Sequence, residues 1–156
     1  MNSRAIFQKR LSLAVKEATE EVAEEAREHH RYTSRTGNLE RAIDTSYGSE
    51  GLIGYAFLNT GTAPYGPFVH EGTKPHDIFP RGRTALRWVG KGGSSFIFAK
   101  RVHHPGTKED QFLFDALDRK REAIHAIFSR QVGQSLDEVV ADMEAGTRKT
   151  ILRINL

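Results

Sequence analysis

The segment Thr60–Arg83 constrains the fold most, because no regular pattern runs through its twenty-four residues. It holds four of the chain's five prolines and shows neither helical nor strand periodicity. Connections of this length are uncommon in compact domains and are usually functional or disordered. Apolar side chains distributed along it predict an ordered loop: Tyr65, Phe68, Val69, Ile78 and Phe79.

Regular elements are expected on both sides of this loop. Apolar residues step by three and four from Ser3 to about His30, within residues 1–30, which predicts one long amphipathic helix. Two β-rich stretches, Thr45–Tyr47 and Leu52–Leu58, flank a Gly-containing turn and predict a hairpin. A second hairpin is expected from Ala85–Val89 and Ser95–Val102, with the turn at residues 90–93. A short helical turn is expected at residues 39–43.

The last third of the chain, residues 110–145, has a helical pattern. Asp110 is placed to cap its first helix, and Gly133 is expected to interrupt or bend that helix. A last helical stretch is expected from Ser135 to about Glu144, with Gly146 as its stop signal. Residues 147–156 suit an arm that docks on a neighbour, an edge strand or a frayed end. We therefore expect one α+β domain over residues 1–156, with a long N-terminal helix and C-terminal helices packed on a small antiparallel β-sheet. That sheet and the long Pro-rich loop occupy residues 44–108.

Composition narrows the class of protein. The chain has no cysteine, which excludes disulfides and thiolate sites. Six glutamates in the first thirty residues and the lack of a long apolar run argue against a signal peptide or a membrane span, so we expect a cytoplasmic protein. The net charge of +3 is weak evidence for nucleic acid. Acidic residues 17–28 and basic residues 81–108 suit contacts between subunits, or are solvated faces.

The histidines near the long loop are the main candidates for chemistry. Residues 70–77 hold two histidines and two carboxylates, which are ligand types for zinc. Their spacing departs from a metalloprotease helix, because Lys74 occupies the second histidine position and Pro75 follows it. Histidines that only form hydrogen bonds in the loop are the ordinary interpretation. The alternative is a metal-dependent hydrolase or nuclease that uses His70, His76, His103 and His104.

Other chemistries have less support. The chain contains no Gly-x-Ser-x-Gly motif, and residues 90–93 lack the spacing of a phosphate-binding loop. The strand Phe96–Arg101 mixes aromatic and basic side chains, which would give salt-sensitive binding of nucleic acid through Lys100 and Arg101. Its alternation favours aromatic side chains in the core, and Trp88 is also expected there.

Five motifs follow one another along the chain between residues 36 and 117. They are Thr36-Gly37-Asn38-Leu39, Pro64–His76 with Glu71-Gly72-Thr73, Ala85-Leu86-Arg87-Trp88, Phe96–Lys108 with His104-Pro105-Gly106, and Phe112–Leu117. In this order they resemble the tail-completion, or head–tail joining, family of long-tailed bacteriophages, and the resemblance covers roughly residues 36–117. Gln111 departs from the family pattern, which commonly has proline before Phe112-Leu113.

The resemblance implies a structural virion protein without enzymatic activity or cofactor. It implies an α+β fold with a helix packed on a small antiparallel sheet, and a ring of six copies at the junction between phage neck and tail tube. Expected partners are further copies of the chain, a neck or connector protein, and a tail terminator or tail tube protein. DNA would pass non-specifically through the ring, and no membrane is involved. The protein would lie in the virion tail or neck, and in the host cytoplasm during assembly.

The long loop is the expected contact surface. Prolines reduce the entropy lost when a loop is immobilised across a subunit boundary, and interface energy concentrates in a few aromatic anchors. Glu71 is expected to meet a cation of the adjacent subunit, for which Arg81, Arg83 and Arg101 are the candidates. The full set of predicted subunit-contact residues is Tyr65, Phe68, His70, Glu71, Lys74, His76, Phe79, Arg81, Arg83, Arg101 and His103.

Overall fold

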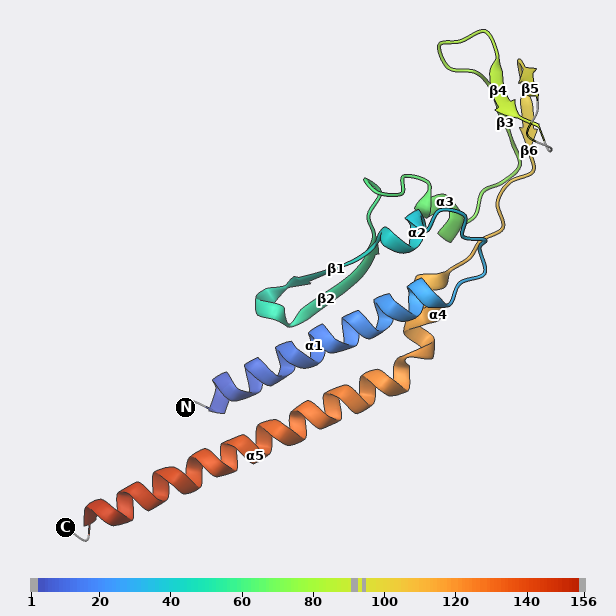
Figure 1. The fold of residues 1–156 in the computed structure, drawn as a ribbon. Helices are drawn as coiled ribbons and strands as arrows, with labels where there is room; N and C mark the ends of the chain where they lie inside the picture. Colours follow the sequence, from blue (N-terminus) through green and yellow to red (C-terminus); the bar gives the residue numbers. More distant parts are fainter. Residues whose placement is uncertain (1–2, 91–92, 94, 155–156) are drawn as a thin grey trace.

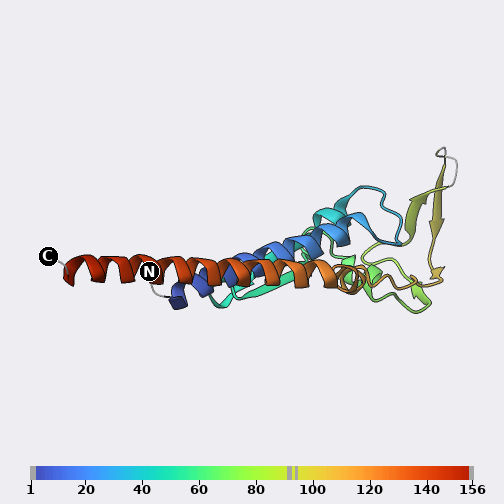
Figure 2. The ribbon, with the colours of Figure 1, turned by 90° about the horizontal axis from the view of Figure 1, so that it is seen from below.

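A computed structural model of the protein describes residues 3–90, 93 and 95–154. Two long helices, α1 (Ser3–Glu28) and α5 (Arg121–Ile154), lie side by side and antiparallel (Figure 1; Figure 2). A β-hairpin lies along the other side of α1, and short strands project from the far end of the molecule (Figure 1). The expected α+β class is confirmed.

The long N-terminal helix is confirmed, although α1 ends at Glu28 rather than His30. Its buried side chains are mostly small, and Ala14 and Ala18 pack against Ile127 of α5. Small side chains at these positions let two elements approach the helix closely. α1 therefore contacts α5 and the hairpin at the same time. None of the described helices has an apolar stretch that could cross a membrane.

The first predicted hairpin is also confirmed. Strand β1 (Ile43–Gly48) pairs antiparallel with β2 (Ile53–Leu58), and the 3₁₀ turn η1 (Ser49–Gly51) joins them. Gly54 lies against α1, where a Cβ atom would overlap the Thr19 hydroxyl. The absence of a side chain at this position lets β2 lie directly on the helix.

The Pro-rich segment is more regular than its sequence suggests. Gly66–His70 forms helix α3, and His76–Ile78 forms strand β3. Pro67 stands in the first turn of α3, where its missing N–H costs no hydrogen bond. The prediction of one continuous loop is therefore wrong at these two places. The helical turn expected at residues 39–43 is present as α2 (Asn38–Arg41).

In the described part of the chain, the strands form three separate two-stranded ladders rather than one sheet. Strand β4 (Leu86–Val89) pairs with β5 (Phe96–Ala99), as the second predicted hairpin requires. The predicted strand Ser95–Val102 is divided, because its end belongs to β6 (Val102–His104), which pairs with β3 instead. Of the predicted turn, residues 91 and 92 lie outside the described residues.

Two helices complete the chain, α4 (Phe112–Arg119) and α5. The predicted interruption at Gly133 and stop at Gly146 are both wrong, because α5 runs through them to Ile154. A glycine costs a helix only about 1 kcal/mol relative to alanine, and 34 residues of helix tolerate two. Residues 147–154 thus continue the helix and form neither a separate arm nor an edge strand.

The main core lies where α1, α2, β1 and α4 meet. Phe112 is its largest fully buried side chain, and it packs among Ala26, Leu39 and Ile43. The Tyr32 ring meets Phe112 edge-on, with 5.2 Å between ring centroids. The segment that leaves α1 and the segment that enters α4 therefore share one core.

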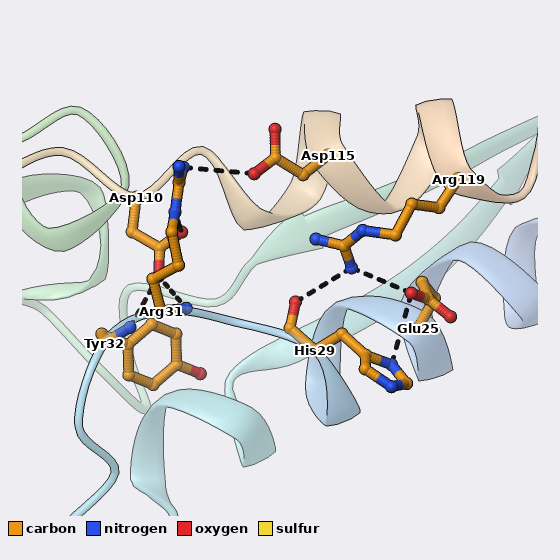
Figure 3. Close-up of polar contacts among 7 residues, drawn as sticks. All are labelled: Glu25, His29, Arg31, Tyr32, Asp110, Asp115 and Arg119. Carbon is orange, nitrogen blue, oxygen red and sulfur yellow. Dashed lines mark hydrogen bonds and ion pairs between the residues drawn. The ribbon is translucent and has the colours of Figure 1, made fainter.

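A buried carboxylate joins those two segments (Figure 3). Asp110, only 4% exposed, accepts hydrogen bonds from the backbone N–H of Arg31 at 2.5 Å and of Tyr32 at 2.7 Å. The Arg31 side chain also reaches Asp110 at 3.2 Å and Asp115 at 3.1 Å. The prediction that Asp110 caps a helix is wrong, since Gln111 precedes α4 and Asp110 bonds across the fold.

A second polar contact involves Glu25, in the last turn of α1 (Figure 3). The Glu25 carboxylate accepts a hydrogen bond from Arg119 of α4 at 2.9 Å, and His29 lies 3.3 Å from it. Lys120 adds a further positive charge at 3.6 Å. The Arg119 hydrogen bond is the main cause of a lowered pKa at Glu25, and the charges of His29 and Lys120 act in the same direction.

We expect Asp110→Ala to destabilise the protein by about 2–3 kcal/mol, because two backbone N–H groups lose their acceptor. Chemical denaturation of the variant and the parent chain measures the difference. Asp118→Ala is the matched control, because Asp118 is exposed and pairs only with Arg121 three residues away. Equal losses in the two variants would contradict a structural role for Asp110.

We expect Glu25→Gln to cost about 1.5–3 kcal/mol near neutral pH, because charged hydrogen bonds to Arg119 are lost. The folded-state pKa lies below the ordinary value of 4.5, so this stability is fully present above pH 4.5. It disappears as the pH falls below 4.5 and through the lowered folded-state pKa. Denaturation at several pH values checks this, with exposed Glu24→Gln as control. A difference that is independent of pH would refute the assignment.

Candidate subunit-contact surfaces

Residues 72–108 form a projecting β-arm that carries β3, β4, β5 and β6. Figure 1 shows it extending beyond the end of α1, away from the paired helices. The β-arm contains eight lysines and arginines and a single acidic residue, Asp77. None of the buried hydrophobic residues in the described chain belongs to it. The β-arm is thus basic and lacks a core of its own.

The base of the β-arm is closed by backbone contacts. Thr73 and Thr107 form an isolated bridge, with N···O distances of 2.8 and 3.1 Å. Gly106 has a φ of 91° and lies so close to the opposite strand that a Cβ atom would overlap the Thr73 carbonyl oxygen. Only glycine suits both conditions at this position.

Three side-chain contacts lie close to this base in sequence. The His76 and His104 rings lie 5.1 Å apart, and Asp77 pairs with Arg101 at 2.8 Å and with His103 at 3.1 Å. The His103 hydrogen bond, followed by the Arg101 contact, lowers the pKa of Asp77. Arg101 and His103, predicted to contact another subunit, therefore each have a carboxylate partner within the chain.

The predicted histidine cluster does not come together in one site. His70 is 8% exposed and packs edge-on against Phe112 and Phe114, with centroid distances of 5.2 and 5.1 Å. Within the described residues, Nε2 of His70 has no hydrogen-bond partner, and no three His, Asp or Glu side chains lie in a metal-binding arrangement. The arrangement of these side chains therefore does not support the hypothesis of a metal-dependent hydrolase or nuclease.

The other predicted contact residues are exposed. The three aromatic anchors all reach the surface, and so do the charged and histidine side chains of this region. They lie over α3 and along the β-arm, so they do not form one compact patch. These residues are Tyr65, Phe68, Glu71, Lys74, His76, Phe79, Arg81 and Arg83.

The β4–β5 ribbon has apolar side chains on both faces. Directly opposed residues share a face, so Arg87, Val89, Phe96 and Phe98 form one side, called here the Phe98 face. The other side, the Trp88 face, consists of Leu86, Trp88, Ile97 and Ala99. Phe96 is 56% and Phe98 64% exposed, and Trp88 is 40% exposed. The prediction that these aromatic side chains lie in the core is therefore wrong, because they are exposed on the surface of the chain.

An apolar groove of about 620 Å³ lies on the body of the molecule. α1 contributes Val15 and Val22, β2 contributes Phe57, and α4 contributes Phe114 and Leu117. α5 contributes Ile124 and Phe128. His70, the last residue of α3, and Glu71, which follows it, lie at its edge and are among its few polar residues. Sequence reasoning missed this groove, because it forms only when five separate elements come together.

Residues 132–143 of α5 provide a third surface. The end of this helix extends past the start of α1 (Figure 2). Val132, Leu136, Val140 and Met143 recur at intervals of three and four on this helix, and all four are exposed. This apolar stripe could have been found from helical periodicity, but the expected stop at Gly146 and bend at Gly133 concealed its continuity.

We expect Gly106→Ala to loosen the base of the β-arm, because the new methyl group would overlap the Thr73 carbonyl oxygen. Amide hydrogen exchange at Thr73 and Thr107 should accelerate at least about tenfold, equivalent to 1.4 kcal/mol. Gly82→Ala is the control, because Gly82 also has a positive φ but no atom near its added Cβ. Comparable exchange in both variants would show that the close approach does not hold the β-arm.

Protein-family models, curated proteins and solved structures gave no match to this chain. The resemblance to tail-completion proteins therefore rests on the ordered motifs of the sequence.

Proposed function

We propose that the protein is a structural virion subunit of a long-tailed bacteriophage, a tail-completion or head–tail joining protein. It forms a ring, of six copies by family resemblance, that connects the tail tube to the neck. The ordered motifs between residues 36 and 117 supply the family. The surface of the chain independently supports the class of function, which is assembly with other subunits.

The observation that carries this proposal is the β4–β5 ribbon with apolar side chains on both faces. A two-stranded hairpin is at best marginally stable alone in water, and large exposed apolar patches mark contact sites. Phe96 and Phe98 belong to this ribbon, and more than half of each side chain is exposed to solvent. A partner that covers the ribbon would remove this apolar surface from water.

The total surface supports the same function. The chain exposes 11491 Å², whereas folded monomers of its mass expose about 7,900 Å². The excess is roughly 3,600 Å². A typical stable interface removes about 800 Å² from each partner. The chain therefore has enough surplus surface for several subunit contacts.

Assembly of Phe98→Ser tests the proposal. The parent chain should form closed oligomers in size-exclusion chromatography with light scattering, and should complete purified tails. Phe98→Ser should associate about 30-fold more weakly, since loss of a central aromatic costs about 2 kcal/mol. Leu13→Ser, which removes an exposed apolar side chain from α1, is the control. A parent chain that stays monomeric and never joins tails would refute the proposed function.

A further inference from the structure

The Phe98 face of the β-arm and the apolar groove are complementary in chemistry. The Phe98 face presents Val89, Phe96 and Phe98 to solvent. The groove is concave and lined almost entirely by apolar side chains. Each phenylalanine can bury about 150–250 Å² in such a site, which makes the pair strong anchors.

One charged pair fixes the orientation of this contact. Arg87 lies opposite Phe98 in the ribbon register, and its guanidinium lies 4.5 Å from the centre of the Phe96 ring. Glu71 lies at the edge of the groove and is exposed. Among the described residues, no ion pair reaches either Arg87 or the Glu71 carboxylate. The Glu71 carboxylate of one copy could therefore pair with the Arg87 guanidinium of another.

The two surfaces lie on different parts of the molecule. The groove lies over the middle of α1, whereas the β-arm projects beyond the end of that helix (Figure 1). Contact between such unlike surfaces is heterologous, and repeated heterologous contacts close into a ring when the rotation between copies permits it. Each copy would then donate one β-arm and accept another.

The available surface is sufficient for this arrangement. A copy with two neighbours would lose about 1,600 Å², which is about 800 Å² at each contact. This is less than half of the roughly 3,600 Å² by which the chain exceeds a compact monomer. The α5 stripe remains outside both contacts.

We propose that the Phe98 face of one copy docks in the apolar groove of the next copy, with Arg87 meeting Glu71 at the groove edge. This inference rests on the proposed assembly function and names the contact through which copies join. Phe96 and Phe98 fill the groove and take the place of the core that the β-arm lacks. Arg87 and Glu71 set the direction in which the ribbon enters.

Disulfide trapping between two different chains tests this contact, and the lack of native cysteine leaves no background thiol. One sample carries Val89→Cys, which lies on the Phe98 face and leaves both phenylalanine anchors in place. A second, size-tagged sample carries Leu117→Cys in the groove. Mixed and oxidised, they should form a linked heterodimer. Docking raises the local thiol concentration to about millimolar, so the yield should exceed that of the control at least tenfold. The control pairs Val89→Cys with Ala126→Cys, which is exposed on α5 and does not line the groove.

The two substituted residues are exposed, so the variants should keep the parent fold. A heterodimer yield no higher than that of the Ala126→Cys control would overturn the docking contact. If the parent chain still forms oligomers and completes tails in that case, the proposed function survives and only this contact fails. If the parent chain neither oligomerises nor completes tails, the proposed function fails as well.

Discussion

The hydrogen bonds that the Asp110 carboxylate accepts from Arg31 and Tyr32 are the contact on which the rest of the structure depends. They join two segments 79 residues apart in sequence, at the points where the chain leaves α1 and approaches α4. Everything between these points, including the β1–β2 hairpin and the β-arm, is a loop closed by this contact. Closing a loop of this length costs chain entropy, which the burial of Phe112 two residues later helps to offset.

The two ends of the molecule consequently differ in how they are stabilised. The body has a continuous core between α1, β1 and α4, whereas the β-arm relies on short ladders, the Thr73–Thr107 bridge and the Asp77 pairs. Segments with few buried apolar contacts open more readily than the core of the same protein. A partner that covers the β4–β5 ribbon must therefore also offset the entropy of ordering it. In the proposed assembly, order in the β-arm would thus be coupled to the contact between copies.

Local patterns in the sequence were enough to predict α1 and both hairpins, because periodicity and turn residues are determined by near neighbours. They could not predict what covers a strand. The alternation around Phe96 and Phe98 identifies β5 correctly. The sequence pattern of an apolar strand is the same, however, whether the residues that bury it belong to its own chain or to another chain. The expectation that Asp110 caps a helix fails for a related reason, because the backbone N–H groups that donate to its carboxylate belong to a distant segment. The groove likewise depends on five elements meeting, which no local pattern contains.

Charge in the body is largely satisfied within one chain, and this limits how copies can recognise each other. Glu17 pairs with Arg130 and Glu21 with Lys120, so much of the acidic stretch of α1 is neutralised by α4 and α5. A contact between an acidic face and a basic face, which the sequence also allowed, would have to break such pairs. Glu71 stands apart, because it borders the groove and no described cation pairs with it. In the contact proposed above, recognition between copies would therefore depend on the fit of aromatic side chains in the groove, with the Glu71 carboxylate setting the orientation.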